Sequence, residues 1–597
     1  MTADATTELG FDPDALRAKY RAERDRRLRP DGNDQYVEPA GALGQYVEDP
    51  YVDPGFRREP LTDEVEVVVI GGGFGGLLAA ARLREAGIDD VRVIEKGGDF
   101  GGTWYWNRYP GAACDIESYI YLPLLEETGY LPVEKYAQGP DILAYSRRIG
   151  EHFDLYRNAC FQTEVTDLTW DETDQRWIVA TGRDDRIRAR YVITAGGPLH
   201  RPKLPGVAGI ASFTGHSFHT SRWDYDYTGS VADGLPGLAG KRVGIIGTGA
   251  TAVQCVPHLG AAAGELFVFQ RTPSSIDVRA NRPTDPEWAA SLQPGWQRAR
   301  MDNFNTLVSG GRADEDLVSD GWTDIIRNLA VMATRAGREG DPAAAQLVQL
   351  ADFRKMEQIR ARVDAVVRDP AIAEALKPYY NQFCKRPCFH DSYLDTFNRP
   401  TVTLVDTHGR GVDRITERGV VVDGHEYELD VLIYATGFEL GTDFSRRVGF
   451  EVRGRGGVTL TDRWRDGPAT LHGFYSHGFP NFFVVSITQS GLTPNFPHML
   501  AEQAAHLAYV LTEAAARGAR TIEADPAAEA AWVETIVELS ELRRAFLTEC
   551  TPGYYNNEGQ ASPRSARGAS YGRGSLAFLK LLREWRAEGT LAGLVLS

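Results

Sequence analysis

Cysteine is scarce in this chain, because its 597 residues include only six and these are widely scattered. So few cysteines at such spacing imply no disulfide framework. Cys384 and Cys388 do not form the CxxC of a dithiol redox centre or a zinc knuckle. We therefore expect two partly buried thiols near a loop there, no metal site, and a cytoplasmic location in which thiols stay reduced.

Long hydrophobic runs and an excess of basic charge are also missing. No stretch of about 18 uncharged apolar residues exists, so we expect no membrane insertion, and residues 1–40 lack the apolar segment of a signal peptide. The net charge of −17 argues against a nucleic-acid partner. With 43% hydrophobic residues the composition is ordinary for a globular protein, and the length indicates two or three domains.

One basic segment departs from this acidic balance, within an N-terminal extension over residues 1–60. Asp12 and the proline after it can cap and begin a helix that runs through Tyr20 and Leu28 and stops at Pro30. Its arginines could face a membrane or a nucleic acid. Because acidic residues are interleaved with them, we favour a strap that packs on the acidic body.

The order of apolar segments predicts two βαβ units. Residues 65–70 form a short apolar run typical of a buried parallel strand, and a glycine loop, a helix over 77–85 and a strand over 91–94 follow. A second unit begins at 243–246. Residues 161–192 alternate in period two, which predicts an antiparallel excursion between the units.

The first glycine loop reads GxGxxG, with glycines at Gly71, Gly73 and Gly76. The first makes a tight turn, the second lets the backbone approach a pyrophosphate, and the third allows close packing of helix and strand. The helix N-terminus then favours the phosphates. Glu95, at the end of the next strand, can accept a ribose hydroxyl, so this loop predicts a dinucleotide site.

The second loop reads GxGxxA, with Gly247, Gly249 and Ala252. The strand that follows has no acid at its end and is succeeded by Arg271. A carboxylate would repel a 2′-phosphate, whereas a guanidinium binds one through two hydrogen bonds. This site is therefore expected to prefer NADPH over NADH.

Two dinucleotide sites in one chain imply electron transfer between two cofactors. Glu95 suits FAD at the first site, and Arg271 suits NADPH at the second. A disulfide reductase would need a CxxxxC redox pair just after the first unit. The matching region, residues 101–115, contains a single cysteine and cannot form that pair.

Three further motifs carry a family resemblance. Residues 213–223 read FxGxxxHxxxW, residues 101–115 read GGxWxxxxYPGxxxD, and residues 385–387 read KRP. In these motifs the chain resembles the Baeyer–Villiger monooxygenases, flavoenzymes that insert an oxygen atom next to a ketone carbonyl. We interpret His219 and Trp223 as hinge and linker residues rather than acid–base groups.

The resemblance implies a chemistry and the residues that perform it. NADPH reduces FAD, O2 then forms a peroxyflavin, and its attack on a ketone gives an ester or lactone. Arg386 is implied as the catalytic cation that stabilises the anions formed, an effect of roughly 3–4 kcal/mol for one group. Asp115 is implied to orient Arg386 by an ion pair, and Lys385 to lie near the phosphate of the nicotinamide nucleotide.

The residues expected to contact FAD or NADPH extend beyond these motif positions. The whole set is Gly71, Gly73, Phe74, Gly76, Glu95, Thr103, Trp104, Asp115, Tyr121, Val165, Gly247, Thr248, Gly249, Thr251, Ala252, Gln254, Arg271, Thr272, Lys385 and Arg386.

Two segments look like one subgroup of this family, which has an N-terminal extension and includes cyclopentadecanone monooxygenase and the pentalenolactone-pathway oxygenases. They are the stretch from Lys19 to Tyr36 and residues 550–559, CTPGYYNNEG. The likeness implies a large cyclic ketone as the small-molecule substrate, together with O2. Residues 486–499 and the segment after Glu549 are expected to form pocket walls or a lid.

Two alternatives remain open at this point. Flavin monooxygenases that oxygenate nitrogen or sulfur resemble the chain. Their version of the motif at residues 213–223, the fingerprint, usually ends with Phe or Tyr where Trp223 stands. An NADPH oxidase-type flavoprotein is the second alternative, and the presence of Arg386 and Asp115 argues against it.

We thus predict an α/β fold with two Rossmann-like dinucleotide-binding domains, one for FAD and one for NADPH. A helical insertion and the N-terminal extension complete it. The predicted boundaries are 1–60 for the extension, 61–198 and 430–597 for the FAD domain and C-terminal lid, 205–275 and 381–429 for the NADP domain, and 276–380 for the insertion.

Overall fold

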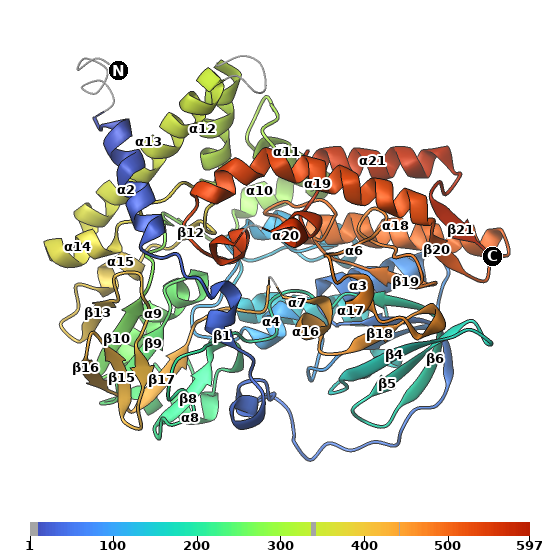
Figure 1. Cartoon of the computed structure of the whole chain (residues 1–597), viewed down its shortest axis with the longest axis horizontal. Coiled ribbons are helices and arrows are strands. Elements are labelled where there is room, and N and C mark those ends of the chain that lie inside the picture. Colours follow the sequence, from blue (N-terminus) through green and yellow to red (C-terminus); the bar gives the residue numbers. More distant parts are fainter. Residues whose placement is uncertain (1–9, 336–341, 441, 561) are drawn as a thin grey trace.

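The computed structural model describes residues 10–335, 342–440, 442–560 and 562–597. Figure 1 shows two lobes, each built around a β-sheet, with helices gathered along one side of both lobes. The long helices of the C-terminal part lie over the first lobe, and α13 and α14 of the insertion lie over the second. Among the described residues, no helix combines the length and the apolar character needed to cross a bilayer.

The first sheet has seven strands in the order β18-β4-β5-β6-β2-β3, with β19 beside β6. β2 is parallel to both β3 and β6, while β4, β5 and β6 pair in antiparallel fashion. The predicted βαβ unit and the antiparallel excursion are therefore confirmed. The strands are β2 Glu64–Ile70, β3 Val91–Ile94, β4 Val165–Asp171, β5 Arg176–Thr181, β6 Arg186–Thr194, β18 Glu451–Arg453 and β19 Phe482–Val484.

The second sheet has five strands in the order β13-β10-β9-β17-β8, all parallel. This confirms the second βαβ unit, in which helix α9 (Ala250–Ala262) connects β9 to β10. The strands are β8 His216–His219, β9 Arg242–Ile246, β10 Glu265–Gln270, β13 Val402–Asp406 and β17 Val431–Tyr434.

The place of β17 corrects one predicted domain boundary. Residues from 430 onward were assigned to the FAD domain, but β17 lies between β9 and β8, with Ile433 opposite Ile245. The second lobe therefore includes the chain as far as Tyr434, the last residue of β17. A four-residue apolar strand suits the interior of either sheet, so its composition does not say which sheet it joins.

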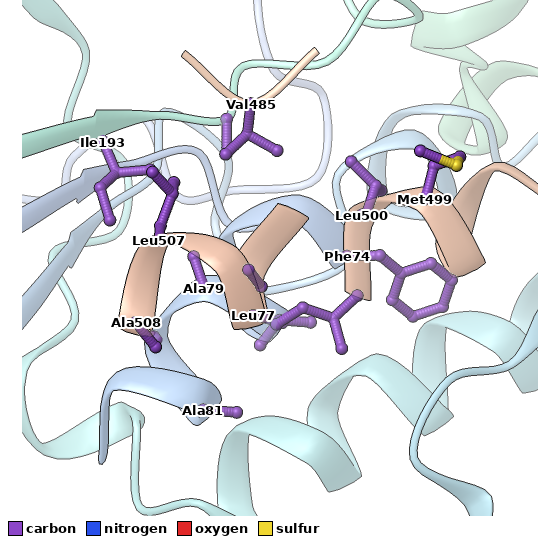
Figure 2. Close-up of a cluster of buried hydrophobic side chains, with 14 of the residues drawn as sticks. Phe74, Leu77, Ala79, Ala81, Ile193, Val485, Met499, Leu500, Leu507 and Ala508 are labelled. Atoms are coloured by element: carbon purple, nitrogen blue, oxygen red, sulfur yellow. The ribbon is translucent and has the colours of Figure 1, made fainter. Parts of the chain in front are cut away.

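Helix α3 (Phe74–Glu85) packs against the C-terminal helix α18 (Phe496–Ala516) over the first sheet. Figure 2 shows this cluster, in which Leu77 and Ala79 of α3 lie beside α18, the helix of Leu507 and Ala508. Small alanine side chains let the two helix backbones approach closely, and the longer chains fill the remaining volume. Through this contact the C-terminal part of the chain holds the first glycine loop in place.

The insertion is helical, as predicted. It comprises α10 Pro286–Ser291, α11 Trp296–Val308, α12 Gly321–Arg335, α13 Pro342–Val366 and α14 Pro370–Leu376. The other helices are α4 Thr103–Trp106, α5 Ser118–Tyr121, α6 Leu125–Thr128, α7 Gly139–His152, α8 Tyr225–Thr228, α15 Tyr393–Thr396, α16 Phe444–Val448, α17 Leu460–Arg463, α19 Pro526–Glu549, α20 Pro563–Arg567 and α21 Ser575–Glu588.

Short strands complete the fold. They are β1 Tyr36–Val37 paired with β7 Leu204–Pro205, β11 Ile276–Asp277 paired with β12 Cys388–Phe389, the small sheet β14 Arg414–Ile415, β15 Gly419–Val422 and β16 His425–Glu428, and β20 Ile522–Ala524 paired with β21 Leu594–Leu596.

The N-terminal helix α2 (Pro13–Asp25) is a packed strap, as its mixed charge indicated. The side chain of Asp12 accepts hydrogen bonds from two backbone N–H groups of the first turn. Tyr20 is buried, with its ring 5.2 Å from that of Phe353 on α13, and Arg360 donates to its hydroxyl at 3.0 Å. Figure 1 shows α2 lying along α13. The helix ends at Asp25, before the predicted stop.

The expectation about cysteine was wrong at one site. Cys384 forms a disulfide with Cys550, 166 positions further along the chain. Cys388 is a buried free thiol, so the two neighbours do not act as a pair. Sequence spacing cannot reveal a pairing between residues so far apart, because only the folded chain brings them together. The bond ties the segment before the KRP motif to the segment after α19.

The α3–α18 contact predicts the effect of a core deletion. Leu507→Ala removes a side chain that is 1% exposed, so it is expected to lower the free energy of unfolding by about 2–5 kcal/mol. Thermal unfolding of the purified protein measures the change. Val133→Ala is the control, because Val133 is 65% exposed and its truncation should shift stability by about 0.5 kcal/mol or less. Equal shifts in the two variants would contradict this packing.

Candidate active site

A single large cavity of 2380 Å³ is bordered by both glycine loops, the aromatic loop of residues 101–115 and the KRP loop. It brings together nearly all of the residues expected at the cofactors. Those in its wall are Gly71, Gly73, Phe74, Glu95, Thr103, Trp104, Asp115, Tyr121, Val165, Gly247, Thr248, Gly249, Thr251, Gln254, Arg271, Thr272, Lys385 and Arg386.

Gly76 and Ala252 are the two expected cofactor residues that are not among those bordering the cavity. Each is the third position of its motif and lies behind the loop. A Cβ atom at Gly76 would stand 1.8 Å from the carbonyl oxygen of Gly71, and Ala252 is fully buried. Their small size therefore serves the packing of helix against strand.

The first loop leaves β2 and enters α3 with its backbone facing the cavity. Gly71 has φ 111°, and a Cβ there would meet the carbonyl oxygen of Ala195 at 2.5 Å. The Glu95 carboxylate accepts hydrogen bonds from the N–H groups of Gly72 and Gly97, each at 2.6 Å. Burial raises the pKa of Glu95, and these two donors counteract that rise. The carboxylate is thus fixed where a ribose hydroxyl can reach it.

The second loop leaves β9 and enters α9 in the same way. Gly247 has φ 116°, and a Cβ there would lie 2.4 Å from the carbonyl oxygen of Ala435. A Cβ at Gly249 would meet no atom within 4 Å, so this face of the loop is open. The Thr248 hydroxyl donates to the carbonyl of Thr272 at 2.7 Å. Both loops therefore fit a pyrophosphate at a helix N-terminus.

Arg271 follows β10 and lies in a cluster of charges that the sequence did not suggest. It donates to the Gln35 side chain at 2.5 Å and contacts the Glu558 carboxylate at 3.3 Å. Tyr36 and Lys203 are close by, with the Lys203 ammonium 3.9 Å from the ring centroid of Tyr36. The N-terminal extension and the C-terminal segment therefore meet at the second nucleotide loop.

These contacts were missed, although a signal was present. The segments ending at Tyr36 and containing Glu558 were both recognised as subgroup features, but they stand more than five hundred positions apart. Nothing in their composition relates one to the other. The only signal in the sequence was that both segments belong to the same subgroup pattern.

The aromatic loop connects the two nucleotide-binding halves. Trp104 donates its indole N–H to the Tyr121 hydroxyl at 3.0 Å. Tyr109 donates to the side-chain oxygen of Gln254 on α9 at 2.8 Å. Gly111 has φ 80°, and a Cβ there would stand 2.5 Å from the Gln254 carbonyl oxygen, so only glycine fits this close contact.

Arg386 and Asp115 form the ion pair that was predicted. The guanidinium donates to the carboxylate at 2.5 Å, and its carbon lies 5.2 Å from the ring centroid of Trp322. Trp322, at the start of α12, donates its indole N–H to the Asp115 carbonyl at 3.1 Å. The helical insertion thus helps to hold the pair.

The electrostatics of this pair keep a positive charge in the cavity wall. Burial by itself lowers the pKa of Arg386, but the charge and hydrogen bond of Asp115 raise it well above the ordinary value. The Arg386 side chain is still 34% exposed, toward the cavity. A guanidinium in this position can stabilise an oxyanion, since it cannot lose its proton in the process.

The fingerprint residues His219 and Trp223 are fully buried and lie outside the cavity wall. Burial lowers the pKa of His219 to about 3, so the ring is neutral and unsuited to acid–base work near neutrality. Trp223 donates its indole N–H to the Thr228 hydroxyl at 3.0 Å. Both side chains thus belong to the packing of the connection.

The expected pocket walls are confirmed on both segments. From residues 486–499, Leu492, Pro494 and Phe496 are among those that border the cavity. After Glu549, Tyr554 and Tyr555 border it as well.

Lys385, the first residue of the KRP motif, extends its side chain to the C-terminal segment. Its ammonium donates to the carbonyl of Pro552 at 2.8 Å. Burial lowers the pKa of Lys385 to about 7, with a smaller contribution from the positive charge of Arg271. The residue is therefore a cation in mildly acidic solution and largely neutral in alkaline solution.

This pKa predicts a pH-dependent contribution to phosphate binding. Lys385 carries its proton below a pH of about 7, so its attraction for a phosphate is strongest there and fades as the pH rises. Lys385→Met is expected to weaken binding of adenosine 2′,5′-bisphosphate roughly tenfold in mildly acidic buffer and far less in alkaline buffer. Calorimetry on FAD-loaded enzyme gives the wild-type-to-variant ratio, in which ionisation of the ligand cancels. A ratio that does not change with pH would contradict the assignment.

Comparison with known proteins shows which family has this sequence and this arrangement of sites. Residues 68–284 match the family described as pyridine nucleotide-disulphide oxidoreductase. Neopentalenolactone D synthase of Streptomyces avermitilis is 53% identical over 98% of this chain and 99% of its own length. Baeyer-Villiger monooxygenase ATR8 of Stachybotrys chlorohalonatus is 52% identical over 98% of this chain and 95% of its own length.

Solved structures agree with these relatives. The polycyclic ketone monooxygenase of Thermothelomyces thermophila superposes with a TM-score of 0.92 at 41% identity, over 98% of this chain and 99% of that one. A steroid monooxygenase bound to NADP superposes with a TM-score of 0.72 at 31% identity, over 89% of this chain and 99% of that one. These names favour ketone oxygenation over oxygenation of nitrogen or sulfur. The chain belongs to the Baeyer–Villiger monooxygenase family, whose members use FAD and NADPH to oxygenate ketones.

Proposed function

We propose that this enzyme oxygenates bulky cyclic ketones to esters or lactones, with Arg386 and Asp115 as its catalytic residues. The observation that carries the proposal is their 2.5 Å ion pair in the wall of the cavity that both nucleotide loops share. The volume of 2380 Å³ and the names of the polycyclic ketone and steroid monooxygenases support a large substrate.

The cofactors supply the redox chemistry, since NADPH provides a hydride to FAD and the reduced flavin activates O2. The residues of this chain bind, orient and stabilise. Arg386 faces the cavity as a permanent cation, where the carbonyl oxygen of a ketone becomes an anion on attack. Asp115 fixes the direction of the guanidinium, so the charge needs little rearrangement when that anion forms.

Aromatic side chains form part of the cavity wall. They are Trp322, Phe383, Phe496, Tyr554 and Tyr555. Apolar walls strengthen each electrostatic contact and limit unproductive loss of reduced oxygen species. The same walls suit the hydrocarbon surface of a large cyclic ketone.

Recognition of the 2′-phosphate of NADPH is assigned to Arg271, Thr272 and Lys385. Arg271 offers a guanidinium fork at the end of β10, which is the chemistry that a phosphate prefers. The Thr272 hydroxyl is buried and lacks a hydrogen-bond partner among the described residues, and it borders the cavity. An unsatisfied buried hydroxyl there is available to a bound phosphate or ribose.

We place the enzyme in the cytoplasm, with no nucleic-acid partner. The net charge of −17 supports the second statement, because like charges repel a polyanion. The disulfide between Cys384 and Cys550 would be exposed there to thiol systems that reduce such bonds.

The role of Arg386 predicts a loss of chemistry without loss of cofactor. Arg386→Ala is expected to lower kcat for lactone formation by roughly 10²–10³-fold, since one oxyanion-stabilising group is removed. Gas chromatography of the product from a bulky cyclic ketone measures it, and absorbance of bound flavin reports on FAD. Arg418→Ala is a matched control, because Arg418 is 67% exposed and is not among the residues that border the cavity. Wild-type lactone formation in Arg386→Ala would refute the assignment.

The substrate class predicts a ranking of ketones. A polycyclic or macrocyclic ketone is expected to show a kcat/KM at least roughly tenfold above that of cyclohexanone, because it buries more apolar surface in the cavity. Steady-state NADPH consumption, corrected by measured product, gives both values. A preference for cyclohexanone would refute the assignment to bulky substrates and leave the role of Arg386 intact.

A further inference from the structure

Glu558 is a carboxylate placed among cations at the second nucleotide loop. The cations are Lys203, Arg271 and Lys385, which we call the basic cluster. Arg271 contacts Glu558 at 3.3 Å, and the Glu558 side chain is 4% exposed. The Tyr36 hydroxyl lies 3.4 Å from its other oxygen. Every member of the basic cluster borders the cavity, and so does Glu558.

The charges of this group act on one another. Burial lowers the pKa values of Lys203 and Lys385, and the negative charge of Glu558 counteracts this in both. Arg271 has the opposite effect on the two lysines. Glu558 is therefore the carboxylate that acts on both lysines, and Glu439 adds a further negative charge near Lys203.

The chain holds Glu558 in this place at a cost in backbone conformation. Asn557 and Glu558 have φ 52° and 54°, in the left-handed region that residues with a Cβ rarely adopt. The turn is anchored on both sides. Asn33 donates to the Asn557 side chain at 2.5 Å, and Gln560 donates to the Pro30 carbonyl at 3.0 Å. The disulfide at Cys550 attaches the same segment to the KRP loop.

We propose that Glu558 is a specificity-determining residue that occupies the anion position of the NADPH pocket and competes with the 2′-phosphate for Arg271. This rests on the proposed role of Arg271. A phosphate that reaches the guanidinium must displace the carboxylate, because two anions at one fork repel each other. Glu558 thus sets how tightly the 2′-phosphate binds, and it offsets part of the positive charge of the basic cluster when no phosphate is bound.

The first test compares two nucleotides that differ only at the 2′ position. Isothermal titration calorimetry on the FAD-loaded enzyme measures adenosine 2′,5′-bisphosphate against 5′-AMP. Glu558→Gln removes the competing charge with little change of shape, so we expect the bisphosphate to bind roughly tenfold more tightly and 5′-AMP to bind as before. An unchanged or weaker affinity for the bisphosphate would overturn the proposal.

Glu523→Gln is the matched control. Glu523 is a nearly buried carboxylate paired with Arg455 at 3.0 Å, and it does not border the cavity. Its substitution should leave both affinities as in the wild type. Equal tightening in both variants would show a general effect of lost negative charge and would overturn the specific role of Glu558.

A measurement on the wild-type enzyme needs no variant. Hydrogen exchange of residues 553–560 is compared with saturating adenosine 2′,5′-bisphosphate and with saturating 5′-AMP. Displacement of Glu558 should speed exchange in this segment with the bisphosphate and not with 5′-AMP. Equal protection by the two nucleotides would overturn the proposal.

Arg271→Gln tests the role of Arg271 separately from the role of Glu558. If it reduces the affinity for the bisphosphate to that for 5′-AMP, the role of Arg271 stands, and the Glu558 variant then tests Glu558 alone. If Arg271→Gln leaves the affinity for the bisphosphate unchanged, the proposed role of Arg271 fails, and the inference about Glu558 fails with it.

Discussion

The structure depends on one requirement, that a permanent positive charge be held in the wall of a cavity shared by two nucleotide sites. Arg386 meets it, but only because Asp115 pairs with it and Trp322 supports that carboxylate residue from the helical insertion. A guanidinium left without a partner in a confined apolar site would be costly. The ion pair lowers that cost and fixes the direction of the charge, which is what stabilisation of an oxyanion needs.

The pairing of Arg386 with Asp115 also explains why the two lobes meet at the aromatic loop and the KRP loop. Asp115 ends the aromatic loop of the first lobe, and Arg386 lies in the KRP loop of the second. Tyr109 and Gly111 of the aromatic loop rest on Gln254 of α9, so the first lobe is seated on the helix that carries the second glycine loop. The loop that carries Asp115 is thereby positioned by one side-chain hydrogen bond and by one close backbone contact that glycine alone permits.

The two ends of the chain close the nucleotide side of the cavity. Gln35 from the extension and Glu558 from the C-terminal segment both contact Arg271, and the disulfide between Cys384 and Cys550 attaches that segment to the KRP loop. The extension, whose basic helix could have suggested a membrane or nucleic-acid surface, packs on the body and forms part of the cavity wall. Its arginines are balanced by carboxylates of the body, as with Arg21 and Glu549.

The sequence by itself determined the local elements and the two glycine loops, because these follow from residue types at short, fixed spacing, and the family resemblance of two motifs implied the pairing of Arg386 with Asp115. It could not determine that residues 431–434 join the second sheet, that Cys384 pairs with Cys550, or that Gln35 and Glu558 meet at Arg271. These facts are contacts between segments remote in the chain. Periodicity and spacing encode local geometry, whereas remote contacts are decided by the packing of the whole fold.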